Sequence, residues 1–597
     1  MERIKFSITE NEKETNGTNY KINIKFPMNL GWIDNVQFVI DGLSHQMNHL
    51  KNEEDYAYFQ TEIYLATKAI YHYHFSFTIN NNLFFLKNEE MKMSVNFNTP
   101  DWAKGKIMYH IFVDRFNRTK KPLKLMKNRT IHSLWTEDIV VGPDNNGRWN
   151  TDFYGGSIQG IIEKLDYIKS LGVSIIYLSP IFYAQSNHRY DTSDYENIDP
   201  YIGTNNDLKK LCDKAHRRGI KIIIDGVFNH TGNDSKYFNE YGNFPELGAY
   251  QSKESKYFPF YKTEIKDDKI IFDYWWGMKN LPVCDCCSKT WQNYIYGEGG
   301  IIDKWFSYGI DGLRLDVADE LTDEFIYGIR KAVKRNKEDG LIIGEVWKNP
   351  MHMNRGYIES GKGMDSVMNY QLADALIRYF KYNDINILKK VTQELITEYP
   401  TDTLNTIMNF TSTHDISRAI NIFSSNKFDP NNEWIWDLKI NNYEEEKKYK
   451  LNKKQYNLGK KIYSAYLYTL TFMPGILSIF YGDEIGMEGM GNLANRRPFT
   501  WDKIDNEILN LFKNIGKIRN NESFLETANL KIIDVNDKYL VFKRYNQNEE
   551  ILVYINRTND NTQIEIPREY KETDILYNLN NSTKEKLKAY GGIVLKK

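Results

Sequence analysis

Residues 311–320 read DGLRLDVADE, and this stretch is the best guide to the architecture of the chain. Its leucines alternate with Gly312, Arg314 and Asp316, so a β-strand here puts the arginine and the carboxylate on one face and the leucines on the other. In a parallel barrel the reactive side chains follow the C-terminal ends of the strands. We therefore predict that this strand carries Arg314 and Asp316 to the mouth of such a barrel.

Apolar runs of similar length lie on both sides of this stretch, and helical patterns separate them. With residues 309–315 included, the candidate strands are 107–113, 174–178, 220–227, 309–315, 341–345, 366–370, 406–410 and 476–480. Eight parallel strands joined by crossover helices are typical of a (β/α)8 TIM barrel. The sequence therefore predicts a multidomain α/β protein whose catalytic barrel spans residues 101–520.

Three other parts of the chain show a different pattern. Residues 1–100 and 527–597 contain short alternating segments between turns, which predicts an N-terminal and a C-terminal β-sandwich. The third and fourth candidate strands are separated by about 80 residues, far more than a βα loop needs. We expect a small inserted domain there, at about 229–300, on the active-site face.

Composition and charge exclude several classes of protein. The 597 residues are 41% hydrophobic and 26% charged, as in soluble globular proteins. A formal net charge of -1 lacks the basic footprint of a nucleic-acid or anionic-membrane binder, so neither partner is expected. The N-terminus, MERIKFSITENEKE, has no signal-peptide pattern, which predicts a cytoplasmic protein.

Two local features have an alternative interpretation. Residues 462–482 are uncharged over a length that could cross a bilayer, but a central Pro-Gly and several tyrosines favour a buried helix followed by a core strand. The cysteines are too few for a disulfide framework, and their C-x-C-C cluster lacks zinc-knuckle spacing. We therefore expect neither structural disulfides nor a zinc site. The cysteines are Cys212, Cys284, Cys286 and Cys287.

A second carboxyl group follows the next candidate strand. Residues 341–347 read LIIGEVW, which brings Glu345 to the same rim with Trp347 two residues later. Glycoside cleavage with retention needs two carboxyl groups, one ionised and one protonated. A guanidinium beside Asp316 favours its ionised form, as a nucleophile requires. The alternative is that Arg314 and Asp316 form a simple salt bridge at the rim.

The ends of two further strands supply acids and imidazoles. Residues 222–230, IIIDGVFNH, present Asp225, Asn229 and His230, and residues 405–415 end in His414 and Asp415. Convergence of four strand ends indicates a site rather than isolated structural histidines. A divalent-metal site is the alternative; it is disfavoured because the chain lacks H-x-H and H-E-x-x-H spacing there and Arg314 would repel a cation.

At these residues the chain resembles the alpha-amylase family of retaining glycoside hydrolases (glycoside hydrolase family 13). The four strand-end motifs appear in order as DGVFNH (225–230), GLRLDVA (312–318), GEVW (344–347) and STHD (412–415). The likeness extends through YHIFVDRF (109–116), HRYDTSDY (188–195), LPVCD (281–285) and FYGDEIGMEG (480–489). It spans about 105–501, with the (β/α)8 fold as its implied architecture.

The resemblance implies roles for individual residues. It makes Asp316 the nucleophile, Glu345 the general acid/base and Asp415 the third carboxylate, which grips the sugar at the cleaved bond. The candidate substrate-binding residues are Tyr190, Asp225, His230, Arg314, Trp347, His414 and Arg496. Within this set Tyr190 would stack on the sugar, and Asp225 would support Arg314. Trp347 could shape the acceptor side or pack the rim, and the sequence leaves both open.

The N-terminal β-module, GEVW and FYGDEIGMEG are most similar to the neopullulanase/cyclomaltodextrinase/maltogenic amylase branch, which implies a homodimer. Two departures argue against that branch's calcium site: residues 117–121 read NRTKK, and Ser157 stands where an aspartate is usual. Asn229, Asp144 and Asn146 remain as candidates for calcium. No cofactor is expected to be required.

We expect the protein to hydrolyse α-1,4 and also α-1,6 glucosidic bonds in maltooligosaccharides, cyclodextrins, pullulan or starch. Departures at Lys348, Asp319 and Asn492 lie near the substrate and leave the bond preference open. The alternatives are a 4-α-glucanotransferase and a non-catalytic glycan-binding protein on the same fold. Retention of the three carboxylates argues against the last of these.

Overall fold

The computed structural model describes residues 4–119, 129–145, 147–267, 269–438 and 442–597. The chain forms two compact units. One contains residues 1–99, 350–365 and 393–404, and the other contains residues 100–349, 366–392 and 405–597. Each unit is described by itself.

The larger unit is built on an eight-stranded parallel sheet in the order β21-β20-β19-β16-β13-β10-β23-β22. A parallel bridge between Met368 and Met408 joins the two edge strands, so the sheet closes into a barrel there. All eight predicted strands are present. They are β10 (Ile107–Ile111), β13 (Ile175–Leu178), β16 (Lys221–Gly226), β19 (Gly312–Leu315), β20 (Leu341–Gly344), β21 (Ser366–Val367), β22 (Met408–Phe410) and β23 (Ile476–Phe480).

The sixth strand is shorter than expected. It ends at Val367 because Asn369 caps the next helix, its side chain accepting a hydrogen bond from the amide of Leu372. Register fixes the neighbours around β19, where Arg314 pairs with Asp225 on β16 and with Ile343 on β20. A side chain at Gly312 would lie 2.3 Å from the carbonyl oxygen of Leu341, so glycine is needed where these strands approach.

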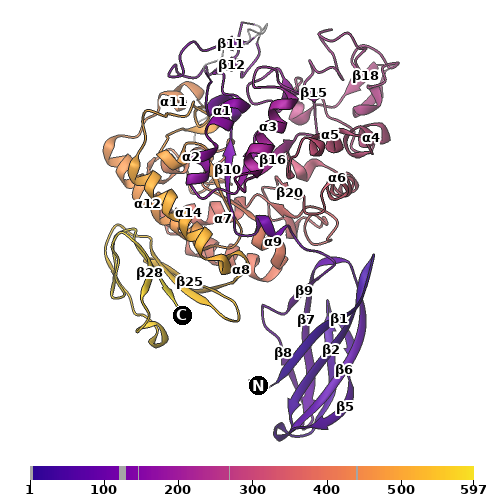
Figure 1. Cartoon of the computed structure of the whole chain (residues 1–597), viewed down its shortest axis with the longest axis vertical. Helices are drawn as coiled ribbons and strands as arrows, with labels where there is room; N and C mark the ends of the chain where they lie inside the picture. The colour runs from indigo at the N-terminus through magenta and orange to yellow at the C-terminus, as the bar shows by residue number, and fades with distance from the viewer. Residues whose placement is uncertain (1–3, 120–128, 146, 268, 439–441) are drawn as a thin grey trace. The chain divides into compact units, whose positions relative to one another are not determined.

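Helices alternate with the barrel strands, as the crossover pattern predicts (Figure 1). Side-chain caps define several helix starts, including Thr204, Thr322 and Asn452. The helices are α1 (Ile158–Glu163), α2 (Leu165–Ser170), α3 (Asn205–His216), α4 (Lys289–Tyr296), α5 (Ile301–Ser307), α6 (Asp323–Asn336), α7 (Tyr370–Tyr382), α8 (Ile385–Glu398), α9 (Thr401–Thr406), α10 (Ala419–Ser424), α11 (Tyr443–Lys448), α12 (Lys453–Phe472), α13 (Gly491–Ala494) and α14 (Asn506–Asn521).

The uncharged stretch 462–482 forms the second half of α12 and the strand β23, as predicted. Both are buried against the barrel. None of the helices in the described ranges combines the length and apolarity needed to cross a bilayer. All four cysteines are free, with Cys287 exposed and the other three buried.

The long connection between β16 and β19 carries the antiparallel pair β17 (Thr263–Lys266) and β18 (Lys269–Phe272) before α4 and α5. Aromatic side chains hold it together: Phe238 packs edge-on against Tyr261 and Phe272. Shorter strand pairs lie in the connections after β10 and β13. They are β11 (Thr130–Ile131) with β12 (Asp152–Phe153), and β14 (Phe182–Ala184) with β15 (Thr192–Ile198).

The C-terminal part of the larger unit is an antiparallel sheet in the order β24-β25-β26-β30-β28, with a separate pair β27-β29. Its buried core includes Leu552, Tyr554, Ile593 and Leu595. The strands are β24 (Asn529–Val535), β25 (Tyr539–Tyr545), β26 (Glu550–Asn556), β27 (Thr562–Gln563), β28 (Ile575–Leu579), β29 (Lys586–Leu587) and β30 (Gly592–Lys596).

The smaller unit contains two antiparallel sheets, β1-β2-β6-β5 and β4-β3-β7-β8, with β9 paired to β7. Ile22, Phe26, Phe38, Phe75 and Phe77 are fully buried within it. This is the predicted N-terminal β-sandwich. Its strands are β1 (Lys5–Glu14), β2 (Gly17–Pro27), β3 (Ile33–Ile40), β4 (Leu43–Gln46), β5 (Asn48–Glu53), β6 (Tyr56–Ala66), β7 (Lys68–Ile79), β8 (Asn82–Leu86) and β9 (Lys92–Val95).

Candidate active site

The predicted carboxylates converge at the C-terminal ends of adjacent barrel strands. Asp225 lies near the end of β16, Asp316 follows β19 and Glu345 follows β20, and these three strands are neighbours in the sheet. All three side chains are buried. The period-2 alternation that the sequence shows around Arg314 therefore places its charged face toward the barrel mouth.

Arg314 contacts all three of these acids. Its Nη1 donates to Asp225 at 2.8 Å and to Asp316 at 2.7 Å, and its Nη2 lies 2.8 Å from Oε2 of Glu345. The carboxyl groups of Asp316 and Glu345 thus meet two nitrogens of one guanidinium. This arrangement goes beyond the simple rim salt bridge that the sequence left open.

Asp225 accepts hydrogen bonds from Arg314 and from two tyrosines. Besides Arg314, the hydroxyls of Tyr177 and Tyr190 donate to its Oδ2 at 2.6 and 2.9 Å. A carboxylate with three donors is a fixed anion that orients the guanidinium. Asp225 therefore supports Arg314, as the resemblance implies.

Both oxygens of Glu345 have donors. The backbone amide of Val317 donates to Oε2 at 2.9 Å, and the indole N–H of Trp347 donates to Oε1 at 3.0 Å. Val317 has a φ of 37°, in the left-handed region that a β-branched side chain rarely adopts. The backbone next to the proposed nucleophile is therefore strained in the conformation that aims its amide at Glu345.

Asp415 follows β22 and joins the cluster from another strand end. Its Oδ1 lies 3.2 Å from Nε2 of His414 and 3.7 Å from Nη2 of Arg496. Its Oδ2 is buried and has no hydrogen-bond partner among the described residues. Arg496 is itself tied down, because its Nε donates to the carbonyl of His414 at 2.8 Å.

Tyr190 and His414 form a stacked pair beside this carboxylate. Their rings are nearly parallel, at 7° with centroids 5.2 Å apart, and the hydroxyl of Tyr190 is hydrogen-bonded to Nε2 of His414. Tyr190 remains partly exposed. An accessible ring of this kind can pack against the apolar face of a sugar.

Burial dominates the pKa values of the acids. It raises the pKa of Asp316 well above its usual range; Glu345 adds to this, and Arg314 acts in the opposite direction. Burial, followed by the charge of Glu345, raises the pKa of Asp415 to about 7. Arg314 thus favours the ionised form of Asp316, in the predicted direction, and burial opposes it.

The pKa values of the two site histidines are lowered. Burial lowers the pKa of His230 to about 4 and that of His414 well below its usual value, with His110 and Arg496 adding to the second effect. Both imidazoles are therefore neutral at neutral pH. Nε2 of His230 is buried and lacks a partner among the described residues, while its ring stacks on Trp275 at 5.0 Å.

Two of the three predicted calcium candidates, Asp144 and Asn229, already have protein partners. Nη2 of Arg148 donates to Oδ2 of Asp144 at 2.7 Å. The side-chain amide of Asn229 is hydrogen-bonded to His230 and Glu320. Asn146 lies outside the described residues. The hydroxyl of Ser157, at the position where an aspartate is usual, caps α1 by accepting from Gly160. Across the described ranges, no cluster of three or more His, Cys, Asp or Glu side chains could hold a metal ion.

Some residues around the site were not predicted. Tyr177 pairs with Ile223 on β16, two residues before Asp225, so it lies on the same face of the sheet as Asp225, and this periodicity could have identified it. Trp347 packs the rim, because it stacks on Tyr370 at 4.2 Å, and it also donates to Glu345; a role on the acceptor side stays a prediction. Trp434 and Trp436 join it from a distant connection that carries no periodic signal.

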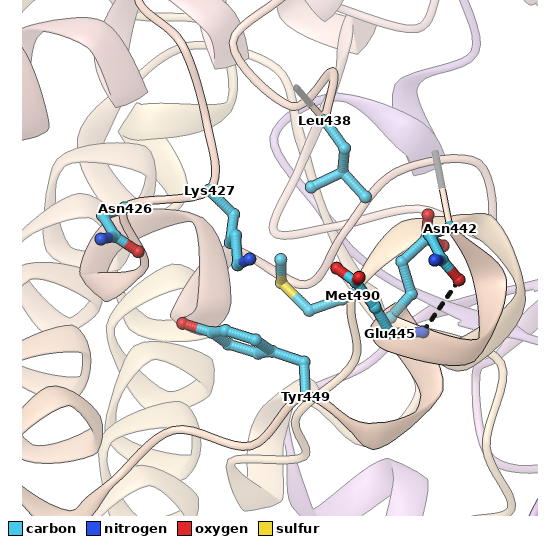
Figure 2. A pocket seen from close by; sticks show the side chains of 8 residues that line it. Asn426, Lys427, Leu438, Asn442, Glu445, Tyr449 and Met490 are labelled. Atoms are coloured by element: carbon cyan, nitrogen blue, oxygen red, sulfur yellow. Dashed lines mark hydrogen bonds between the residues drawn. The ribbon is translucent and has the colours of Figure 1, made fainter. Parts of the chain in front are cut away.

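A separate cavity of about 400 Å³ lies along the connection between β22 and α12 (Figure 2). Asn442, Glu445, Tyr449 and Met490 help to line it. None of the predicted catalytic or binding residues does so. It is therefore distinct from the carboxylate cluster.

Comparisons with known proteins agree with this geometry. The alpha-amylase catalytic-domain family matches residues 110–543. An amylopullulanase of Thermoanaerobacterium saccharolyticum is 34% identical over 540 residues, covering 80% of this chain and 40% of that protein. A cyclomaltodextrinase of Geobacillus thermopakistaniensis is 30% identical, covering 79% of this chain and 72% of that protein.

Among solved structures, the type III pullulan hydrolase from Thermococcus kodakarensis superposes with a TM-score of 0.69 at 25% identity, covering 100% of both chains. The chain spans between 28% and 40% of the length of the three amylopullulanases it matches. The family match covers most of the chain and includes every strand end that carries a predicted carboxylate. The chain therefore belongs to the alpha-amylase family of glycosidases.

Proposed function

We propose that this protein hydrolyses α-1,4 glucosidic bonds, and α-1,6 bonds as a second target, in maltooligosaccharides, cyclodextrins, pullulan or starch. The observation that carries this proposal is the placement of Asp316 and Glu345 on two nitrogens of the Arg314 guanidinium. Two carboxyl groups held against one point of the barrel mouth suit a retaining double displacement.

In the first step, one carboxylate oxygen of Asp316 attacks the anomeric carbon of the sugar. The bond from that carbon to the glycosidic oxygen breaks, and Glu345 transfers its proton to the departing oxygen. An ester between Asp316 and the sugar results, and the leaving group departs as a neutral alcohol.

In the second step, water attacks the same anomeric carbon. Glu345, now ionised, takes a proton from the water as the ester bond to Asp316 breaks. The two inversions return the α-configuration, and Glu345 regains the proton that it gave away. Atoms and charge balance over this cycle with the two carboxyl groups and water alone.

The charges at the barrel mouth support these protonation states. Arg314 and Arg496 contribute two positive charges, and Asp225 accepts from three donors as an ionised carboxylate does. One further negative charge balances the two arginines. We assign it to Asp316, whose Oδ1 lies 2.7 Å from Nη1 of Arg314. The double displacement in turn requires the proton on Glu345.

The remaining residues would bind the sugar at the cleaved bond. Asp415 offers to sugar hydroxyls a buried oxygen that has no partner within the described ranges, and the neutral His230 offers a ring nitrogen in the same condition. Tyr190 would stack on the face of the ring. Strengthening of these bonds as the ring flattens would stabilise the transition state.

Product analysis on cyclodextrin, pullulan, maltotriose and soluble starch tests this proposal. The wild-type protein should release reducing ends, and proton NMR should show an α-anomer as the first product. Asp316→Asn should abolish turnover with an unchanged melting temperature. Activity near the wild-type level in this variant would contradict the assignment.

A 4-α-glucanotransferase is the second candidate, and the aromatic side chains beside Glu345 favour it. Such side chains can hold an acceptor sugar in place of water. Longer oligosaccharides formed from maltotriose would support transfer. Binding to these glucans with no reducing-end release and no transfer would instead indicate a glycan-binding protein.

A further inference from the structure

The connection between β22 and α12 is unusually long for a barrel. It runs from residue 411 to residue 452 and includes α10 and α11, whereas βα loops usually have only a few residues. Long ordered connections at this end of a barrel commonly carry function. Within this connection, residues 430–437 contain Trp434 and Trp436.

Residues 430–437 are held firmly by α7. Arg378 donates to three carbonyl oxygens of this segment, those of Pro430, Asn432 and Glu433, the last two at 2.9 and 3.1 Å. Asp374, one turn earlier, pairs with Arg378 at 2.6 Å and accepts from the amide of Ile435 at 2.8 Å. A buried ion pair therefore fixes the backbone on both sides of Trp434.

These contacts of Arg378 and Asp374 place four aromatic rings together beside the proposed proton donor. Trp434 stacks on Trp436 at 5.3 Å and 9°, and it meets Trp347 edge-on at 5.6 Å. Trp347 stacks on Tyr370 and donates its N–H to Oε1 of Glu345. Tyr370 and Trp436 are buried, whereas Trp347 and Trp434 are partly exposed. The accessible edge of the cluster is thus formed by Trp347 and Trp434.

We propose that Trp434 is a specificity-determining residue that binds glucose units of the leaving group. The inference rests on the proposed function, because Glu345 identifies the leaving-group side by donating its proton to the departing oxygen. The Trp347 indole lies between Trp434 and Glu345: Trp434 meets this ring edge-on, and its N–H donates to Oε1 of Glu345. A sugar bonded to that oxygen would meet this edge, and its C–H faces pack well on indole rings.

Two substrates separate this role from catalysis. Maltotetraose places glucose units on the leaving-group side, whereas α-maltosyl fluoride releases only fluoride. Trp434→Ala should lower the ratio of kcat/KM for maltotetraose to kcat/KM for α-maltosyl fluoride by about three- to tenfold, the effect of losing one aromatic stacking contact. Trp434→Phe retains a stacking face and should recover most of that ratio.

Trp102→Ala is the matched control. Trp102 is also a partly exposed tryptophan, but it precedes β10 and so lies at the N-terminal ends of the strands, away from the carboxylates. This variant should keep the wild-type ratio. Melting temperatures of all the variants report whether any change reflects loss of folded protein.

Two outcomes would overturn the inference: an unchanged ratio in Trp434→Ala, or equal losses on both substrates that Trp434→Phe does not restore. If the wild-type protein cleaves neither substrate, the proposed function fails separately. The inference is then judged by calorimetric binding of maltotetraose, where equal Kd values for wild type and Trp434→Ala would overturn it.

Discussion

Nη1 of Arg314 lies 2.7 Å from Oδ1 of Asp316, and the same nitrogen lies 2.8 Å from Oδ1 of Asp225. One guanidinium therefore links Asp316, the proposed nucleophile, with Asp225, which takes no part in the proposed reaction. Because Asp225 is fixed by two tyrosine hydroxyls, it fixes Arg314, and Arg314 in turn orients Asp316. The geometry of the proposed nucleophile depends on this chain of contacts.

Replacing Arg314 by lysine tests that dependence. A single ammonium cannot keep contacts with Asp225, Asp316 and Glu345 together, because it lacks the planar fork of the guanidinium. We expect Arg314→Lys to lower kcat by about a hundredfold or more, comparable to loss of one transition-state donor. The melting temperature should fall as well, since buried carboxylates lose a partner. Steady-state kinetics and thermal unfolding measure the two effects.

Glu345→Gln tests the proton donor. Cleavage of a glucan should fall by about a hundredfold to ten-thousandfold, because the departing alcohol needs a proton. Fluoride is a good leaving group without one, so the burst of fluoride from α-maltosyl fluoride should be far less affected. Asp316→Asn is the matched control and should lose both reactions. Equal losses on both substrates in Glu345→Gln would reassign the donor.

The position of the candidate catalytic residues at strand ends was predictable because their signal is local. A period of two residues places Arg314 and Asp316 on one face of β19, and the parallel register then sets Asp225 beside Arg314. Each motif carries this information within a few residues. The apolar runs separated by helical patterns predicted the other strands of the barrel.

Features that depend on packing between distant segments were not predictable. Trp434 is held near the site because Arg378 donates hydrogen bonds to the carbonyl oxygens of Asn432 and Glu433. No periodicity in residues 430–437 predicts these contacts. The sequence shows only one of the two influences on the pKa of Asp316. The neighbouring arginine, which lowers this pKa, is visible in the sequence, but the burial that raises it arises from the whole barrel mouth.

Chelation tests the absence of a calcium requirement. Arg148 neutralises the Asp144 carboxylate, and Ser157 uses its hydroxyl to cap α1, so neither offers a free anionic ligand. Treatment with EDTA should leave the melting temperature and the rate of glucan cleavage unchanged. A fall of several degrees that added calcium reverses would show a site that these residues do not reveal.

Asp415→Asn should lose activity and gain stability at high pH. The pKa of Asp415 is raised to about 7, so between its ordinary value of 3.8 and pH 7 the unfolded chain loses this proton before the folded protein does. The free energy of unfolding therefore decreases as pH rises through that range and levels off above it. Asparagine keeps the shape and removes the charge.

At pH 8 we expect the asparagine variant to be more stable than wild type by about 1 kcal/mol or more, given roughly 1.4 kcal/mol per unit of pKa shift and partial exposure of the side chain. At pH 4 the two proteins should be similar. Urea unfolding at both pH values measures this, and a larger gain at pH 4 would contradict it. Turnover should be lost at either pH.

Val317→Gly should relieve the strain beside the nucleophile. At a φ of 37° the Cβ of valine is crowded, at a cost of roughly 1–3 kcal/mol, whereas glycine adopts this conformation freely. Glycine also gives the unfolded chain more freedom, which offsets roughly 0.5–1 kcal/mol of the gain. Val317→Ala keeps the crowded Cβ and loses two methyl groups, so it serves as the matched control.

We expect Val317→Gly to be more stable than Val317→Ala in urea unfolding, yet to have a lower kcat than wild type. The rate should fall because a freer backbone no longer holds the Val317 amide 2.9 Å from Oε2 of Glu345. A glycine variant less stable than the alanine variant would mean that the left-handed backbone stores no strain. A glycine variant with wild-type kcat would mean that the amide does not position the proton donor.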